Sequence, residues 1–314
     1  MEYSQKMGLG VGGGVVSPGK NLLVFSGIAS DARDLMERFG INDYNGETLI
    51  FADIDSAVGA CMASRGDTIY VAPGHTSTIS SATALALDVA GITIKGLGEG
   101  TKRPTLTFDT ANTATIAVSV ADVVIENVVF SANYADIASL FTLTTAKNFT
   151  LRNCGFVATA SAMNFLTLVT TNATANASDG LTIDNCSWVE PDTATSTMLT
   201  VVGDLDGLTV KDSYLNLGVN TNDLPAIAIV ATGKDLTNVM IDSNDVIRLN
   251  DANALLITAD TTTANTGIVK NNNVRHLDTA GELLVTTATN IGFFRNNATA
   301  AVDKSGFIIP AIDA

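Results

Sequence analysis

The sequence is poor in aromatic and charged residues for its length of 314 residues. Aromatic residues make up 6% of the chain and charged residues 16%, against about 25% charged in an average soluble protein. Apolar residues still make up 46%, which excludes bulk disorder. One Trp, five Tyr and twelve Phe supply few of the aromatic platforms that carbohydrate grooves use. The composition therefore indicates a folded protein without a well-furnished sugar-processing cleft.

Basic residues are also scarce, and long apolar runs are absent. The 17 basic and 32 acidic residues give a formal net charge of −15, which opposes the phosphate neutralisation that dominates nucleic-acid affinity. No stretch reaches the roughly 18 consecutive apolar residues that cross a bilayer. Glu2 and Lys6 precede a glycine run where a signal peptide would carry a leucine-rich segment. We therefore expect no nucleic-acid partner, no membrane insertion and no secretion signal.

Cysteine and histidine, the usual metal and nucleophile residues, are few. The three cysteines (Cys61, Cys154 and Cys186) are too few for a disulfide scaffold and odd in number. We expect them to be small buried hydrophobic residues. The only histidines, His75 and His276, lie 201 residues apart, so we expect no catalytic or metal pair between them. We expect His75 in a solvated turn, and a pH-sensitive contact is the alternative to a structural role for His276.

What the sequence does contain is an internal repeat. Eight short segments end at intervals of 25 to 32 residues, about 28.6 on average, and each alternates like a short strand. They are residues 92–96, 123–127, 149–153, 181–185, 208–212, 239–243, 267–271 and 292–296. A period of this size is typical of a solenoid, in which equivalent residues of successive copies stack.

Three columns of the repeat predict how its copies are oriented. The residue two before the end is apolar and should face inward: Ile94, Ile125, Leu151, Ile183, Val210, Ile241, Val269 and Phe294. The last residue is of a type that turns a strand, and we expect an asparagine ladder there: Gly96, Asn127, Asn153, Asn185, Asp212, Ser243, Asn271 and Asn296. Two or three residues later a stack of aromatic and branched side chains is expected: Phe130, Phe156, Trp188, Tyr214, Val246 and Val274.

The column just before the turn alternates in charge. It reads Lys95, Glu126, Arg152, Asp184, Lys211, Asp242, Lys270 and Arg295, and the alternation fails only at the last member. Because equivalent residues of neighbouring strands lie about 4.7–4.9 Å apart, each charge should meet opposite charges on both sides. A slip by one turn would bring like charges together, so this column specifies the register.

A second strand precedes most copies, and loops rich in Ala, Thr, Asn and Asp join the two. The second strands are expected at residues 115–118, 140–143, 165–168, 198–201, 226–229, 255–258 and 283–286. Two strands and one irregular side per copy predict a coil of roughly triangular cross-section. Loops of variable length are typical of solenoids, where insertions gather on particular edges.

The residues before the coil predict an arm and a cap. Residues 8–19 are glycine-rich, and their formal dinucleotide motif (Gly8, Gly10, Gly13) follows no strand, so it indicates no cofactor. Ser30 to Phe39 and Asp53 to Ser64 show helical spacing, and a strand is expected at residues 48–52 between them. A cap of this kind would protect the open end of a sheet.

The short helix, the segment GDTIYVAPG (66–74) and the segment ITIKGLG (92–98) together resemble the opening of the pectin-lyase-like right-handed parallel β-helix family. The resemblance covers about residues 48–300 and implies an all-β, right-handed parallel β-helix of about eight turns. We accordingly assign residues 1–47 to an N-terminal arm and short helix, 48–300 to the β-helix and 301–314 to a C-terminal closing tail.

Candidate chemical residues are acidic, and none forms a recognisable cluster. Enzymes of this family use clustered aspartates or paired carboxylates, whereas Glu126, Asp184 and Asp242 alternate with Lys or Arg and lie nearly 10 Å apart on alternate turns. Asp204 and Asp206 in the loop GDLDG lack the further oxygen ligands of a calcium loop. We therefore expect no catalytic, cofactor-binding or metal-binding residue, and hence no enzyme.

The function expected from these features is structural. The opening motif with GLGEGTKRPTLTF (96–108) resembles β-helical virion proteins of tailed bacteriophages. This resemblance implies a virion component, a capsid decoration, head fibre or tail part, assembled in the host cytoplasm. It further implies a homotrimer that joins other virion proteins through the N-terminal arm and contacts host-surface glycans. The alternative is a tailspike-like polysaccharide depolymerase or lyase with carboxylates contributed across a subunit boundary.

Overall fold

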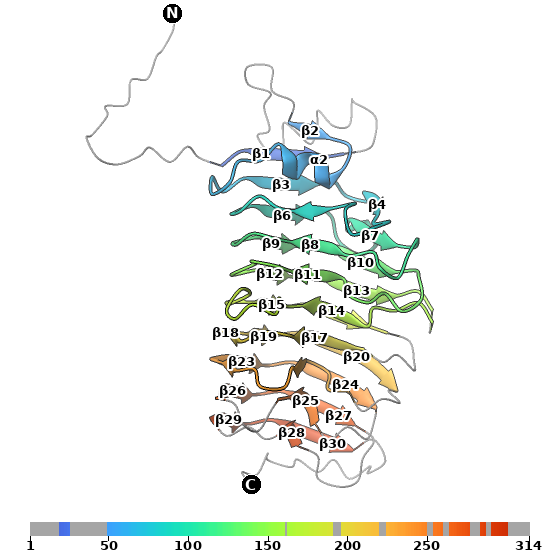
Figure 1. Ribbon diagram of the computed structural model, residues 1–314. Helices are drawn as coiled ribbons and strands as arrows, with labels where there is room; N and C mark the ends of the chain where they lie inside the picture. Colours follow the sequence, from blue (N-terminus) through green and yellow to red (C-terminus); the bar gives the residue numbers. More distant parts are fainter. Residues whose placement is uncertain are drawn as a thin grey trace, which may run out of the picture.

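The computed structural model describes residues 19–25, 49–160, 162–190, 196–219, 224–249, 254–259, 264–276, 283–286 and 290–300. In these ranges nearly every regular element is a β-strand, and the strands stack from the N-terminal to the C-terminal end of one coil (Figure 1). The predicted parallel β-helix of about eight turns is confirmed. The helix expected at Ser30 to Phe39 and the tail at 301–314 lie outside the described residues.

Three parallel sheets form the sides of the coil in the described part of the chain. Sheet A has eleven strands in the spatial order β2 (Ile50–Phe51), β1 (Asn21–Val24), β3 (Thr68–Val71), β6 (Thr93–Gly96), β9 (Val124–Glu126), β12 (Thr150–Arg152), β15 (Thr182–Asp184), β19 (Thr209–Lys211), β23 (Val239–Asp242), β26 (Thr266–Lys270) and β29 (Asn290–Phe294). Sheet B has nine: β4 (Thr76–Thr78), β7 (Thr105–Phe108), β10 (Val129–Ala132), β13 (Gly155–Ala158), β16 (Ser187–Val189), β20 (Tyr214–Val219), β24 (Asp245–Leu249), β27 (Asn273–His276) and β30 (Asn297–Ala300). Sheet C has eight: β5 (Ala86–Leu87), β8 (Ile116–Val118), β11 (Phe141–Leu143), β14 (Thr167–Thr170), β17 (Thr197–Val201), β21 (Ala228–Val230), β25 (Ala254–Thr258) and β28 (Leu283–Thr286).

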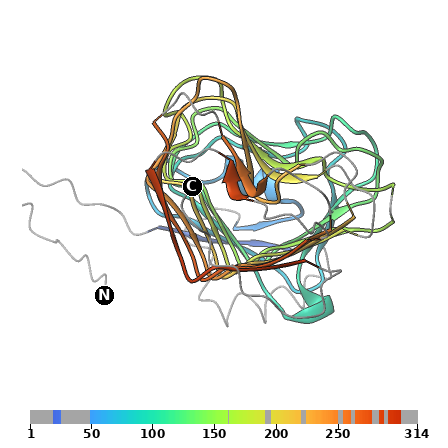
Figure 2. The same ribbon diagram turned by 90° about the horizontal axis from the view of Figure 1, so that it is seen from below.

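A typical turn of the coil contains one strand from each sheet, in the order A, B, C. The sequence analysis expected two strands and one irregular side, but the third side is the regular sheet B. The view along the axis shows the sheets enclosing the interior, with loops projecting at the corners (Figure 2). A further two-stranded pair, β18 (Leu205–Asp206) with β22 (Leu236–Thr237), lies between sheets C and A in two turns.

The corner from sheet A to sheet B is a tight turn that places one residue in the left-handed region. The φ angles are 50–59° at these positions, where Asn, Asp and Ser are well tolerated. The residues are Asn127, Asn153, Asn185, Asp212, Ser243 and Asn271. The predicted turn column is thus confirmed over six copies.

The last copy of the repeat is shifted by one residue from the predicted alignment. Arg295, not Asn296, has the left-handed φ of 54°, and Lys270 pairs with Phe294 rather than with Arg295. Phe293 faces the core, whereas Phe294 is 56% exposed. The misplacement has a simple cause: a one-residue slip moves every side chain of a strand to the opposite face, and GFFRN offers an apolar residue for either alignment.

The buried polar ladder lies one residue after the turn column, not in it. Asn244, Asn272 and Asn296 are buried and stacked above one another. Each amide oxygen accepts the backbone N–H of the residue one turn earlier, at 3.0–3.1 Å for Ser213, Asn244 and Asn272. The predicted column does contain one stacked amide pair, in which Asn153 Nδ2 donates to Asn127 Oδ1 at 3.2 Å, and its last member, Asn296, belongs to the buried ladder. The other two members of the buried ladder, Asn244 and Asn272, each lie one residue after the predicted position.

The interior is packed with aliphatic and aromatic side chains in register. Phe130 and Phe156 stack with ring centroids 5.6 Å apart, and Trp188 follows on the next strand. The next member is Leu215, not the predicted Tyr214, because Leu215 pairs with Trp188 and Tyr214 is exposed. Such pairs contribute about 0.5–1.5 kcal/mol beyond the area they bury.

The N-terminal end differs from the expected arm in one respect. Strand β1, inside the segment assigned to the arm and short helix, pairs in parallel with β3 and belongs to sheet A. The predicted helix at Asp53 to Ser64 is shorter: α2 spans Ile54–Gly59, capped by the Asp53 carboxylate, which accepts the Ser56 N–H. Helix α2 packs on β1, β2, β3 and β5. In the described ranges no helix has the length and apolar character of a membrane span.

Candidate functional site: the charged face of sheet A

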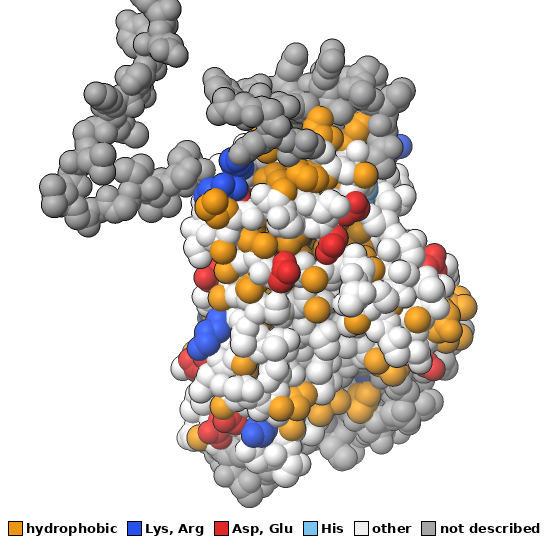
Figure 3. Space-filling model, turned by 45° about the horizontal axis from the view of Figure 1, so that its top comes forward, with side chains coloured by type: hydrophobic (Ala, Val, Ile, Leu, Met, Phe, Trp, Pro, Cys, Tyr) orange, Lys and Arg blue, Asp and Glu red, His pale blue; other side chains and the backbone are white. Residues whose placement is uncertain are grey.

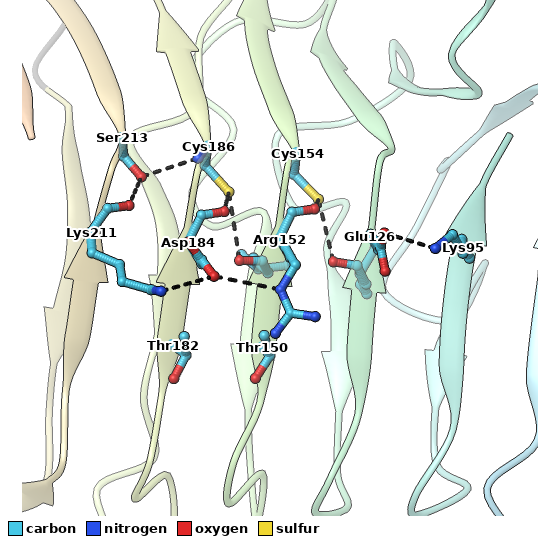
Figure 4. Close-up of polar contacts among 12 residues, drawn as sticks. Lys95, Glu126, Thr150, Arg152, Cys154, Thr182, Asp184, Cys186, Lys211 and Ser213 are labelled. Atoms are coloured by element: carbon cyan, nitrogen blue, oxygen red, sulfur yellow. Dashed lines mark hydrogen bonds and ion pairs between the residues drawn. The ribbon is translucent and has the colours of Figure 1, made fainter. Parts of the chain in front are cut away.

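The outer face of sheet A carries two side-by-side columns of polar residues. Strand alternation puts every second side chain outside, so β12 presents Thr150 and Arg152 while Leu151 faces the core. β15 likewise presents Thr182 and Asp184. The pairing of Thr150 with Thr182 and of Arg152 with Asp184 keeps each column straight. The result is a strip of hydroxyl groups beside a strip of charges, as Figure 4 shows.

The predicted charge alternation is confirmed in part: among the described residues it forms three separate groups of ion pairs, and only Asp184 meets opposite charges on both sides. Lys95 Nζ lies 2.9 Å from Glu126 Oε1. Asp184 Oδ2 lies between two cations, 3.5 Å from Arg152 Nε and 3.3 Å from Lys211 Nζ (Figure 4). These side chains are partly exposed, so each pair contributes about 0–1 kcal/mol. The carboxylates of this face are thereby engaged with cations rather than with one another.

Asp242 extends the ladder and is further tied to the turn. Its carboxylate lies 3.2 Å from Lys270 Nζ and accepts hydrogen bonds from Ser243 Oγ and Asn271 Nδ2 at 2.9 Å each. Burial alone would raise the pKa of Asp242, but these bonds and the Lys270 charge outweigh it, so the pKa lies below its usual value. Asp242 therefore stays ionised over the neutral range.

The strip changes character toward the C-terminal end. The column that holds Thr150, Thr182 and Thr209 continues with Met240 and Ile268. Both apolar side chains are exposed. On the face shown in Figure 3, hydrophobic side chains are spread among uncharged side chains and backbone, and the charged groups are scattered rather than gathered. The hydroxyl groups and the partly exposed charged side chains of sheet A can form hydrogen bonds with a polar polymer that lies along the coil. They do not form a pair of groups placed for general acid–base catalysis.

The other acidic candidates serve the corner between sheets C and A. Asp206 accepts hydrogen bonds from Thr237 Oγ1 and Asn238 Nδ2, which lower its pKa. Asp204 accepts the backbone N–H of Asp235 at 3.1 Å. Among the described residues, no three His, Cys, Asp or Glu side chains gather as a metal ion would require.

The two histidines are not brought together. His75 is buried rather than solvated, and its Nε2 lies 2.7 Å from Ser77 Oγ. Burial lowers the pKa of His75. His276 is buried on β27 near the other end of the coil, so the two rings form no shared site.

Cys154 and Cys186 occupy equivalent positions of consecutive turns, as predicted, and both are buried thiols. Each Sγ lies 3.4 Å from the carbonyl oxygen two residues before it, Arg152 O and Asp184 O respectively. The next members of the same inward column are Ser213 and Asn244. The thiols therefore begin the column that becomes the amide ladder.

The sequence analysis missed a buried charged pair, Glu190 and Arg248, inside the coil. Each lies two residues after a member of the aromatic stack, Trp188 and Val246, and so has inward parity. The alternation of inward and outward side chains along these two strands could have revealed both residues. The sequence analysis assigned the residues that follow Trp188 and Val246 to loops, so it did not extend the alternation to them.

Neither a family model nor a curated relative matches the chain. Among solved structures, a rhamnogalacturonan lyase matches with a TM-score of 0.51 and 12% sequence identity, covering 89% of this chain and 74% of that one. The chain thus shares the pectin-lyase-like β-helix fold. At this identity the likeness shows the fold and transfers no residue role.

This likeness corrects the expectation that the protein is not an enzyme. We had based that expectation on the missing catalytic cluster, yet a chain with the same architecture over most of its length is a lyase. The expectation was wrong because the lack of a catalytic cluster within one chain does not exclude an active site that is completed by residues of another subunit. Catalysis therefore remains among the functions open to this fold.

Proposed function

We propose that this protein is a rigid, surface-presenting component of a tailed-bacteriophage virion, trimeric and placed as a capsid decoration, head fibre or tail part. Its localisation is then the virion, after assembly in the host cytoplasm. The N-terminal segment would attach it to other virion proteins.

The observation that carries the proposal is the ion-pair ladder on sheet A. Glu126, Asp184 and Asp242 each meet a cation of a neighbouring strand, so the charges hold the register of a straight column. Together with the buried amide ladder, they resist slippage of one turn against the next. Stiffness and a regular polar surface suit a part that projects from a particle.

The resemblance of residues 66–108 to phage virion proteins supports the same assignment. In the fold the matching segments, residues 66–74 and 92–108, supply β3, β6 and β7 in the first turns below helix α2. The hydroxyl and charge strips of sheet A also support contact with host-surface glycans, because sugars are bound through such donors and acceptors.

Two measurements test this proposal. Sedimentation of the full chain should give three times its mass of 32.5 kDa, and a monomer would contradict the trimer. Mass spectrometry of gradient-purified particles and gold-labelled antibody should place the protein at capsid lattice points or on the tail. Its absence from purified particles would contradict the virion assignment.

A glycan-cleaving enzyme is the second candidate, and the likeness to a rhamnogalacturonan lyase favours it. Asp204, Asp206 or Asp242 would then act together with groups of another subunit. Purified protein incubated with capsular polysaccharide, lipopolysaccharide and rhamnogalacturonan would shorten one of these chains. Loss of cleavage in Asp204→Asn, Asp206→Asn or Asp242→Asn, with the fold retained, would establish this candidate, and intact polymers in every incubation would remove it.

A further inference from the structure

Unpaired polar atoms gather at one inner corner of the coil. In the described residues nine buried side-chain nitrogen and oxygen atoms have no hydrogen-bond partner, and five of them belong to one cluster. The five are Trp188 Nε1, Glu190 Oε1 and Oε2, Ser196 Oγ and Arg248 Nη1. The exposed fraction of these four residues is between 0 and 3%. We call them the inner polar corner.

Strand alternation explains why these side chains point inward. On β16, Trp188 faces the core and Val189 faces solvent, so Glu190 faces inward again. Val189 pairs with Asn216, and Asn216 with Ile247. Glu190 and Arg248 therefore share one inward column two turns apart, about 9–10 Å along the axis.

Arg248 bridges this separation in part. Its Nη2 donates to the Ser196 carbonyl oxygen at 2.6 Å, and its Nε donates to the Leu224 carbonyl oxygen at 3.1 Å. Ser196 precedes β17, in the same turn as Glu190. The guanidinium thus reaches back toward the carboxylate and keeps Nη1 without a protein acceptor.

The two charges approach each other without forming an ion pair. The Glu190 charge opposes the fall in the pKa of Arg248, which burial lowers to about 10. Burial raises the pKa of Glu190 to about 7, and Ser196, Arg248, Trp188 and the backbone N–H of Phe165 limit the rise, although no donor meets hydrogen-bond geometry with the carboxylate. The Ser196 hydroxyl and the Trp188 N–H are near enough to act on the carboxylate, yet neither meets hydrogen-bond geometry with it.

A buried carboxylate and guanidinium that do not touch are costly unless something satisfies both. The carboxylate needs a donor, whereas Arg248 Nη1 and Trp188 Nε1 need an acceptor. A bridging species must therefore donate and accept at once. Because the corner is enclosed, water is the species whose size and chemistry fit, and buried water typically makes about three such bonds.

We propose that the inner polar corner is a hydration site, where ordered water bridges the Glu190 carboxylate to Arg248 Nη1, Trp188 Nε1 and Ser196 Oγ. The site joins the turn of β16 to the turn of β24 through the core. It accounts for all five unpaired atoms with one kind of ligand.

The direct test is a high-resolution crystal structure of the full chain. The expected result is discrete density within about 2.7–3.2 Å of the carboxylate and of Arg248 Nη1. A direct Glu190–Arg248 ion pair, the absence of any density between the polar groups of the corner, or a larger bound molecule would each overturn the proposal.

A second test uses the titration of the site in urea unfolding of the full chain between pH 4 and 8. Glu190 holds its proton to higher pH in the folded than in the unfolded state, so its contribution to stability falls as pH rises from about 4.5 to 7. The folding equilibrium constant should fall by on the order of a hundredfold across this window relative to Glu190→Gln. Arg248 is the charged group that faces Glu190, and His276 follows Arg248 in the same inward column. Both residues are present in the wild type and in Glu190→Gln, so their titration contributes equally to the two profiles.

Glu126→Gln is the matched control, because Glu126 is a partly exposed carboxylate of the ladder. The fall in the folding equilibrium constant that Glu190 causes should persist in Glu126→Gln, which leaves the inner polar corner intact. A profile of Glu190→Gln identical to that of the wild type would overturn the buried-carboxylate corner. Should Glu190→Gln fail to fold, the wild-type crystal structure still decides.

Discussion

Asn272 and Asn296 are joined twice by the same oxygen. Asn296 Oδ1 accepts the Asn272 side-chain amide at 2.9 Å and the Asn272 backbone N–H at 3.1 Å. Asn272 repeats the arrangement toward Asn244, at 2.9 and 3.0 Å. Each amide therefore satisfies the strand above it while its own NH₂ is used by carbonyls of the coil, Ile241 and Lys270 in the case of Asn272.

Asn272→Ala is expected to lower the free energy of unfolding by about 2–4 kcal/mol, because it leaves buried groups of both neighbouring turns unpaired. Urea unfolding at neutral pH measures the change. Asn273→Ala is the control, since Asn273 is exposed and its side chain only accepts the Asn297 amide at 2.9 Å. That control should cost about 0.5 kcal/mol or less. Equal losses in the two variants would show that the buried ladder is not a special source of stability.

The residues that recur at a distinctive position of each copy could be predicted from the sequence, and the residues whose placement depends on a one-residue register could not. The charged column could be predicted because Lys95, Glu126 and Arg152 alternate in sign at the same position of successive copies. The buried amide ladder was predicted one residue too early at Asn272, because Asn271 and Asn272 are both asparagine and only the left-handed φ of Asn271 separates them. The burial of Glu190 and Arg248 was not predicted, because charged side chains normally lie on the protein surface.

In the corrected register of the last turn, Phe293 packs against the core and Phe294 is exposed, so the two residues should differ in their contribution to stability. Phe293→Ser should lower the unfolding free energy by about 2–4 kcal/mol, because Phe293 packs against the core. Phe294→Ser should lower it by about 1 kcal/mol or less, since Phe294 loses mainly its contact with the Arg295 guanidinium, 4.8 Å from the ring centroid. Thermal unfolding of the two variants compares them. The reverse order would restore the alignment expected from the sequence.

The ladder on sheet A predicts a salt-dependent response at Asp184. Asp184→Asn should lower the unfolding free energy by about 1 kcal/mol or less. Asp184→Lys should lower it further, because Arg152, residue 184 and Lys211 would then form three positive charges in a row.

The extra loss in Asp184→Lys should shrink in 1 M NaCl, where the Debye length is about 3 Å. Urea unfolding at low and high salt provides the comparison, and Asp88→Lys, at an exposed position outside the ladder, is the control. A loss that is the same at both salt concentrations would mean that packing, not charge, sets the effect.

Asp67 connects the first strands of the coil through hydrogen bonds of its carboxylate. Its buried carboxylate accepts the Lys20 N–H at 2.7 Å, the Met62 N–H at 2.8 Å and Arg65 Nε at 2.6 Å. Burial by itself would raise the pKa of Asp67, but the hydrogen bonds from Arg65, Met62 and Lys20 outweigh it and hold the pKa below its usual value.

Because its folded pKa is depressed, Asp67 stabilises the fold above its unfolded pKa, and this contribution is lost as pH falls below about 4. Asp67→Asn should therefore lower the unfolding free energy at pH 7 by about 2–4 kcal/mol and flatten the acid limb of the stability profile. Asp88→Asn should change neither.

Cys61 supplies an independent reporter of the same carboxylate. Burial and, to a lesser extent, the Asp67 charge raise the pKa of the Cys61 thiol to about 12, and Arg65 opposes the rise. In Asp67→Asn the thiolate fraction should increase, so iodoacetamide should alkylate Cys61 faster at pH 8, whereas the buried Cys154 and Cys186 stay unreactive in the folded protein. Peptide mapping of the alkylated protein distinguishes the three thiols. Labelling of all three together would indicate general unfolding, and an unchanged Cys61 rate would contradict the electrostatic link between Asp67 and Cys61.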